Sequence, residues 1–202
     1  MWRPPGRPRV RSIFRAAIAA GFALDCAVAA HAGPEVFQVE PEVSSAAFAV
    51  NHFGVFRQRG RFGGTRGTIV LDAEGHSGSI DLVIDVTSID TGWSARDQWL
   101  RGEDMFDVAR FPVVRFRSTE LVFNQTRLIG ITGLLTLHGV TRPVVLKVER
   151  LECGRRGDEA RDGCGAGAVS TIKRSQFGMG YALGWVSDEV ELSIDVTAHR
   201  HP

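Results

Sequence analysis

Apolar and polar side chains alternate along most of the chain after Gly33. The clearest stretch is SIDLVIDV at residues 79–86, where Ile80 and Leu82 share one face and aspartates occupy the other. The same period of two recurs in residues 44–52, 60–72, 113–118, 142–149 and 190–198. Because successive side chains of a strand point to opposite faces, the pattern predicts antiparallel strands with one apolar and one hydrated face.

Short turn sequences separate these stretches. They include DAEGHSG at residues 72–78, FNQT at 123–126, LHGVTRP at 137–143 and GMGYALGWVSD at 178–188. About eight strands result, and eight antiparallel strands close into a barrel that either fills with side chains or holds one elongated ligand. The sequence therefore predicts an all-β fold, an antiparallel eight-stranded barrel.

One segment, SIDTGWSARDQWLRGEDMFDVARFP at residues 88–112, breaks the alternation. Ser94 and Asp97 have the spacing of a helix capping box, and Trp99 with Leu100 supplies an apolar side. We expect a short helical connector near residues 94–110, lying across one end or side of the barrel.

The acidic residues of this connector allow two interpretations. Five carboxylates could form an acid–base pair or a Mg²⁺ site, but three arginines alternate with them, and Asp97 and Arg101 have the spacing of a helical ion pair. The second interpretation is favoured: capping and ion pairs brace the connector, and Trp93, Trp99 and Phe106 anchor it to the barrel.

The first 32 residues have the organisation of a secretory signal peptide. Five arginines precede an apolar stretch, and Ala30 and Ala32 form a small-residue cleavage site before Gly33. We expect cleavage near Ala32 and export to the periplasm, which leaves one domain at residues 33–202. An uncleaved N-terminal anchor is the alternative.

Composition narrows the class of protein. Residues 1–32 hold five of the 24 basic residues and one of the 23 acidic ones, so the remaining chain is mildly acidic. It has no basic footprint for nucleic acid and no polybasic patch for anionic lipid, and we expect no stable membrane insertion after cleavage.

Cys153 and Cys164 favour a disulfide in an exported protein, free thiols being the alternative, and their spacing matches no zinc pattern.

Several stretches, in order, resemble the YceI-like family of lipocalin-like, polyisoprenoid-binding periplasmic proteins. They are FAVNHFG (48–54), GRF (60–62), SIDTGWSARDQWL (88–100), FDVARFPVVRFRST (106–119), GLLTLHGVTRPVVL (133–146) and IKRSQFGMG (172–180). The resemblance runs from about Val36 to Val196. It implies a lipocalin-like barrel whose interior holds a long-chain amphiphile, such as a polyisoprenoid or a fatty-acid derivative. The cysteine loop is an addition to the family pattern.

The candidate binding residues share the apolar face of the predicted strands. The expected lining consists of Phe48, Val50, Phe62, Ile84, Phe116, Leu135 and Ile194, and the candidate head-group ligands are His52 and Arg174. His52 could equally be a core histidine bonded to a neighbouring strand, because a buried polar group needs a partner in either case. For Arg174 the alternative is an ion pair with the helical connector.

These observations favour an exported binding protein that carries out no covalent chemistry and needs no cofactor or metal, and that serves transport, storage or stress protection. One alternative is a barrel enzyme acting on a lipid-like substrate. Against it, GHSGS at residues 75–79 does not match the GxSxG pattern, and no nucleophile and base have the spacing of a catalytic motif. Another is a surface interaction module of a membrane redox system, with a packed interior. The sequence leaves open the ligand's identity and whether the chain forms a homodimer.

Overall fold

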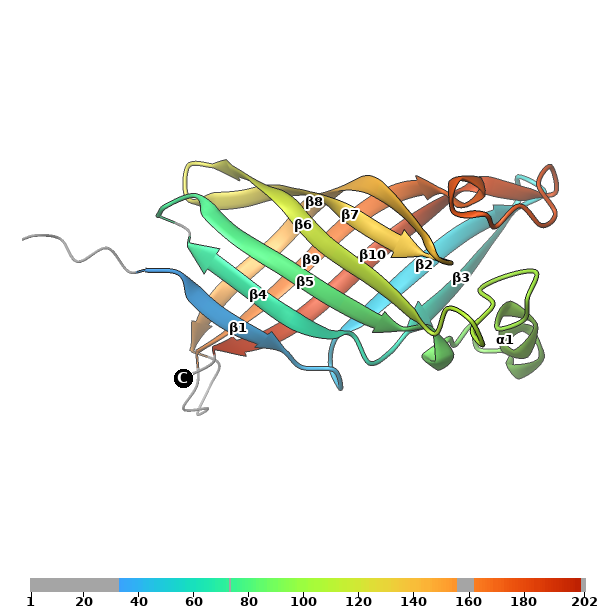
Figure 1. Ribbon diagram of the computed structural model, residues 1–202, viewed down its shortest axis with the longest axis horizontal. Coiled ribbons are helices and arrows are strands. Elements are labelled where there is room, and N and C mark those ends of the chain that lie inside the picture. The colour runs from blue at the N-terminus through green and yellow to red at the C-terminus, as the bar shows by residue number, and fades with distance from the viewer. Residues whose placement is uncertain (1–32, 73, 156–161, 201–202) are drawn as a thin grey trace, which may run out of the picture. The chain divides into compact units, whose positions relative to one another are not determined.

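The computed structural model describes residues 33–72, 74–155 and 162–200. Within them, one antiparallel sheet contains ten strand segments (Figure 1). These are β1 Glu35–Val39, β2 Ser45–His52, β3 Phe56–Phe62, β4 Arg66–Asp72, β5 Ser77–Asp85, β6 Val113–Asn124, β7 Arg127–Leu137, β8 Val140–Arg155, β9 Asp162–Lys173 and β10 Val186–Arg200. Three short helices accompany them: η1 Val86–Ser88, α1 Ser94–Leu100 and η2 Arg174–Phe177. The predicted signal peptide, residues 1–32, lies outside the described residues.

Eight of the segments close into a ring, which confirms the predicted eight-stranded antiparallel barrel. The order runs from β1 through β4, β5, β6, β7, β8 and β9 to β10, which pairs again with β1. β1 and β2 pair with successive parts of β10: Ala198 pairs with Val39 of β1, and Asp195 pairs with Ser45 of β2. β3 lies beside β2, so the ten segments are eight strands of which two are interrupted.

The strand predicted at residues 60–72 is one of the two that are interrupted. It divides into β3 and β4 at residues 63–65, where Gly64 adopts a φ of +63°. That left-handed conformation is easily available to glycine alone, so the paired glycines Gly63 and Gly64 form a bend rather than a continuous strand. The division lets β3 follow β2 while β4 pairs with β1 and β5.

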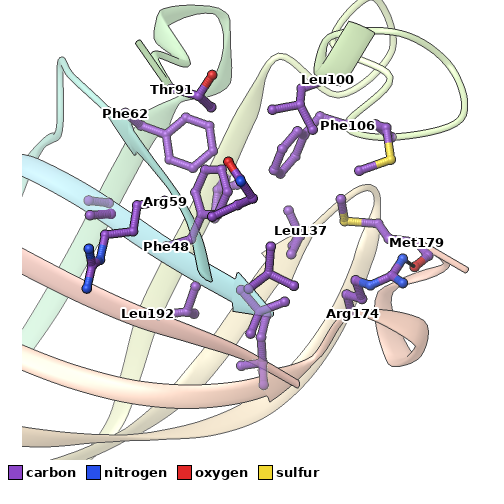
Figure 2. Close-up of a pocket in the computed structure, with 18 of the residues that line it drawn as sticks. Phe48, Arg59, Phe62, Thr91, Leu100, Phe106, Leu137, Arg174, Met179 and Leu192 are labelled. Carbon is purple, nitrogen blue, oxygen red and sulfur yellow. Dashed lines mark hydrogen bonds between the residues drawn. The ribbon is translucent and has the colours of Figure 1, made fainter. Parts of the chain in front are cut away.

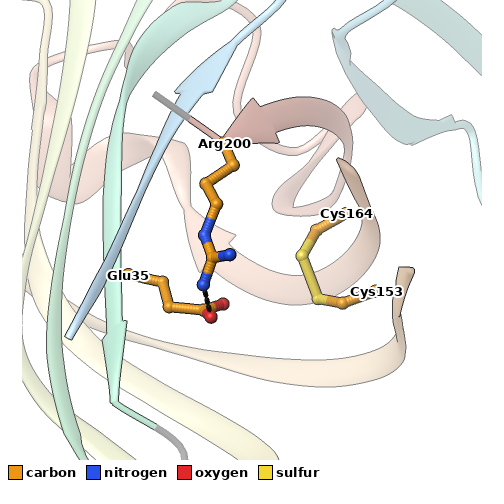
Figure 3. Close-up of a disulfide and its surroundings, with 4 residues drawn as sticks. All are labelled: Glu35, Cys153, Cys164 and Arg200. Carbon is orange, nitrogen blue, oxygen red and sulfur yellow. Dashed lines mark ion pairs between the residues drawn. A yellow bond between two sulfur atoms is a disulfide. The ribbon is translucent and has the colours of Figure 1, made fainter. Parts of the chain in front are cut away.

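Side chains fill the end of the barrel at which β10 ends. Phe37, Leu128, Ile131 and Ala198 are all buried there. An ion pair between Glu35 of β1 and Arg200 of β10, together with a disulfide between Cys153 of β8 and Cys164 of β9, ties this end together (Figure 3). The predicted disulfide is thus confirmed, and we call this part of the barrel the filled end.

The predicted helical connector is present at the opposite end, which we call the α1 end (Figure 1). It covers the unpaired edge of β3, because Arg61 and Asp90 exchange two backbone hydrogen bonds of 2.9 Å. Their side chains also form an ion pair of 2.8 Å. The Gly92 N–H and the Arg61 guanidinium hold the pKa of Asp90 below its usual value. Covering an edge in this way removes a template for unwanted strand pairing.

The detailed contacts of the connector differ from the prediction. Trp93, not a capping-box serine, precedes the helix and makes no side-chain cap, while Asp97 accepts hydrogen bonds from the Thr91 N–H (2.9 Å) and hydroxyl. Arg101 donates to the Thr87 and Ile89 carbonyls rather than pairing with Asp97. These carbonyls lie in and directly after η1, where so short a helix provides no N–H partner for them, and they therefore accept hydrogen bonds from the Arg101 guanidinium.

Candidate functional site

A cavity of about 150 Å³ lies inside the barrel at the α1 end (Figure 2). Inward-facing apolar side chains of β2, β5, β6, β7, β9 and β10 form its wall. The segments that follow the strands cover it, with Leu100 from α1, Met105 and Phe106 from the loop after α1, and Met179 from the loop after η2. Methionine side chains are flexible enough to follow ligands of different shape, so this cover is adaptable.

A glycine opposite Phe48 keeps the cavity open. Phe48 on β2 pairs directly with Gly60 on β3, and a Cβ on Gly60 would lie only 2.4 Å from Phe48 Cζ. The phenyl ring therefore lies against the bare backbone of the neighbouring strand instead of across the lumen. It also packs against Phe62 and Phe106, with ring centroids 5.5 and 6.2 Å away. Three aromatic rings thus form one side of the cavity and hold the connector onto the barrel.

Polar groups gather where the connector meets β3. Arg96 donates through Nε to the Thr91 hydroxyl (2.8 Å), through Nη2 to the Thr91 carbonyl (2.8 Å) and through Nη1 to Gln58. The same Thr91 hydroxyl donates to buried Asp97. Arg96, Gln58 and Thr91 all border the cavity. Three of the five guanidinium N–H groups of Arg96 are used in this way, which leaves two for another acceptor.

Arg174, a predicted head-group ligand, holds a neighbouring loop in place. Its side chain is 5% exposed and donates to the carbonyls of Met179, Tyr181, Val186 and Ser187, at 2.7 to 3.1 Å. Burial withdraws water from the guanidinium and lowers its pKa. Arg174 therefore folds the loop between η2 and β10 around itself and, among the described residues, forms no ion pair with the connector. Its contact with a ligand head group stays a prediction.

Asp188 fixes the start of the same loop. It accepts hydrogen bonds from the Ser175 N–H and hydroxyl, both at 2.8 Å. The backbone N–H is the main cause of the lowered pKa of the Asp188 carboxyl. Together with Arg174, this pair gives the loop after η2 a defined shape beside the cavity.

Among the described residues that line the cavity, His52 has a buried polar atom without a hydrogen-bond partner. It borders the cavity at the end of β2, and its Nδ1 is buried with no hydrogen-bond partner in the part of the chain that the structure describes. A buried polar atom without a partner costs about 1–3 kcal/mol. His52 is thus not a satisfied core histidine, and its Nδ1 would gain from a polar group in the cavity.

The structure brings eight of the nine predicted binding residues together around the cavity: Phe48, Val50, His52, Phe62, Ile84, Leu135, Arg174 and Ile194. Their contact with a ligand stays a prediction. Phe116 is the exception and requires a correction, because it points inward but fills the interior, with 1% of its surface exposed. Its ring lies over Gly133 of β7, where a Cβ would be 2.5 Å from the phenyl carbons.

Sequence reasoning missed several residues of the site. Gln58 and Arg96 come from an arginine-rich strand and a charged connector, and nothing in their spacing distinguishes them from surface residues. Tyr181 was also missed; it borders the cavity together with Trp99, which was predicted as an anchor, and both are about half exposed, with their rings 5.4 Å apart. Trp93, predicted as an anchor, is exposed instead.

Among the described residues, no group of three or more His, Cys, Asp or Glu side chains is placed to hold a metal ion. Within the same residues, no helix has the length and apolarity needed to cross a bilayer.

Two solved structures share the barrel. BcnA of Burkholderia cenocepacia superimposes with a TM-score of 0.68 at 24% identity, over 79% of this chain and 98% of that one. A polyisoprenoid binding domain from Saccharophagus degradans superimposes with a TM-score of 0.59 at 18% identity, over 82% and 98% of the two chains. At these identities the matches establish the fold alone.

Sequence comparison goes further than the fold. A UPF0312 protein of Pseudomonas aeruginosa is 35% identical over 188 residues, which make up 92% of this chain and 96% of that protein. Residues 37–198 match the pattern of the YceI-like domain. That match spans nearly the whole barrel, from β1 to β10, and so this chain belongs to the YceI-like family.

Proposed function

We propose that this chain is a binding protein that holds the apolar chain of an amphiphile in the α1-end cavity. The observation that carries the proposal is an apolar cavity whose polar atoms, on His52, Gln58 and Arg96, lie where strands end and the connector begins. The polyisoprenoid binding domain from Saccharophagus degradans, which has the same fold, is consistent with it. We further propose that the ligand is a long-chain isoprenoid or fatty-acid-like lipid and that the protein acts in the periplasm after signal cleavage.

Partition supplies the binding energy in this proposal. Each CH₂ group moved from water into an apolar lining contributes about 0.8 kcal/mol, close to a fourfold gain in affinity. A cavity of about 150 Å³ is the size of one that holds a benzene ring. The end of the ligand chain therefore lies in the cavity, and the rest extends past the connector unless side chains such as Phe48 move aside.

The head group completes the site. His52 Nδ1 and the two remaining Arg96 N–H groups would meet a hydroxyl, carbonyl or anionic oxygen. An enzyme on this barrel would need a nucleophile hydrogen-bonded to a base, and among the described residues the His52 Nδ1 has no such neighbour.

Displacement of a fluorescent fatty acid by n-alkanols and n-alkanoic acids of rising chain length tests the proposal. Affinity should rise about fourfold per CH₂ until the cavity is full. Leu192→Trp, which places an indole in the cavity, should abolish the rise. Leu134→Trp, the matched change on the outer face of β7, should leave it intact. Equal binding by the two variants would contradict the proposal.

A further inference from the structure

Exposed apolar side chains gather on two neighbouring loops at the α1 end. One is FGVF, residues 53–56, which comprises the loop between β2 and β3 and the first residue of β3, and the other is GMGYALGW, residues 178–185, between η2 and β10. Neither loop contains a charged residue. Their exposed side chains, which we call the aromatic rim, are Phe53, Val55, Phe56, Tyr181, Leu183 and Trp185.

The two loops form one surface. The Phe53 N–H donates to the Trp185 carbonyl at 2.7 Å, and the two rings meet edge to face with centroids 5.6 Å apart. Val55 is 78% exposed and Trp185 is 66% exposed, so this packing leaves most of the surface in water. Figure 1 shows that both loops lie at the same end of the barrel as α1.

The aromatic rim is continuous with the cavity mouth. Tyr181 belongs to the rim and also borders the cavity, and its ring contacts Trp99, which borders the cavity from α1. A molecule that enters the cavity past Tyr181 therefore passes directly beside the rim.

The chemistry of the rim matches the boundary between water and lipid. Tryptophan and tyrosine combine an apolar body with a polar edge and concentrate at that boundary. Charged residues begin at Arg57 and Arg59 where β3 leaves the rim, and at Asp188 and Glu189 where β10 leaves it. Arg57 is paired with Glu191, whereas Arg59 is exposed and has no acidic partner in the described part of the chain. Figure 2 shows its guanidinium pointing away from Phe48 and Phe62, so that it can meet a phosphate while its stem follows the apolar surface.

We propose that the aromatic rim docks on the surface of a phospholipid bilayer, with its loops at the level of the head groups and the cavity mouth open to the interface. A ligand chain then passes from lipid to cavity without crossing water. Monomeric proteins rarely leave contiguous apolar loops of this kind uncovered without such a use. The inference rests on the proposed function for its purpose, but docking and ligand uptake are separate measurements.

Flotation of the full chain with vesicles of phosphatidylcholine and phosphatidylglycerol, mixed three to one, tests docking. The rim variant Val55→Ser/Phe56→Ser/Trp185→Ser is compared with Val43→Ser/Leu134→Ser/Val145→Ser, which removes three exposed apolar side chains elsewhere. The rim variant should partition about a hundredfold more weakly than the parent, because each lost side chain costs roughly a factor of five or more. The control should stay within about threefold of the parent.

Two measurements keep the outcomes separable. Lipids with brominated chains should quench tryptophan fluorescence more in the parent than in a Trp185→Ser variant. Because both proteins contain residues 1–32, the difference in quenching reports on the rim and not on that segment. Fatty-acid uptake in vesicle-free solution should be the same in the rim variant and the parent, so failure of docking leaves the proposed function standing. Equal flotation of parent and rim variant, equal quenching, or a rim-dependent dimer in sedimentation velocity would overturn docking.

Discussion

Replacing Gly60 with alanine should push Phe48 into the cavity. The new Cβ would lie 2.4 and 2.6 Å from two carbons of the Phe48 ring and 3.0 Å from the Thr91 methyl group. The first two distances are shorter than van der Waals contact allows, so the ring has to move. Phe62 and Phe106 pack against other sides of the ring, which leaves the lumen as the free direction.

The magnitude follows from the size of the cavity. A phenyl ring is comparable with a space of about 150 Å³, so a displaced ring removes most of the room for a ligand. Excluding even three methylene groups of the ligand costs about 2.4 kcal/mol, which weakens binding about fiftyfold. The protein itself should lose only about 1 kcal/mol, because overpacking costs about 1–3 kcal/mol and alanine restricts the unfolded chain more than glycine does.

Fatty-acid displacement and urea unfolding of the same samples measure both quantities. Gly165→Ala is the matched control, because Gly165 also lies in a strand and a Cβ there meets nothing within 4 Å. The control should bind as the parent does. If Gly60→Ala kept parental affinity while losing stability, the ring would have moved elsewhere and the assignment of the cavity would be wrong.

Other predictions concern the parts that hold the site in place. Reducing the Cys153–Cys164 disulfide should lower the free energy of unfolding by about 3 kcal/mol in urea titration, as expected for closure of a short loop, yet leave ligand affinity unchanged because the bridge ties the filled end. Arg174→Met should cost about 3 kcal/mol in the same titration, since four loop carbonyls lose a charged donor, and Arg174→Lys should restore only part of it. The lowered pKa of Asp188 stabilises the fold above the ordinary value of 3.8 and loses that effect as pH falls through the lowered value, so acid titration of Asp188→Asn should show a shallower decline below pH 3.8 than the parent does. An equally steep decline would assign the acid sensitivity to other carboxylates.

Alternation along the sequence was sufficient to predict the barrel wall. Ile80, Leu82 and Ile84 are buried as expected, because a period of two leaves only one choice of inward face once one side is dry. Alternation does not say which inward-facing side chains leave room for a ligand. Phe116 and Leu135 both face inward and are paired across β6 and β7, yet Leu135 borders the cavity while the Phe116 ring lies over Gly133 and fills the interior.

Partners of the polar residues could not be predicted in the same way. Arg174 binds carbonyls of a loop, and backbone carbonyls leave no trace in the sequence. The capping box predicted from the spacing of Ser94 and Asp97 was wrong, because the Asp97 carboxylate accepts hydrogen bonds from Thr91, outside the helix. The Gly60–Phe48 contact could have been predicted, since it follows from the register of the hairpin formed by β2 and β3.

Native mass spectrometry tests the central claim most directly. The parent, Leu192→Trp and Leu134→Trp are each incubated with a lipid extract and sprayed under conditions that preserve non-covalent complexes. We expect one lipid per chain in the parent and in Leu134→Trp, and a bare chain mass in Leu192→Trp, because only the last places an indole in the cavity. Bare chains throughout, or a lipid retained equally by all three proteins, would contradict the claim that the cavity at the α1 end is the binding site.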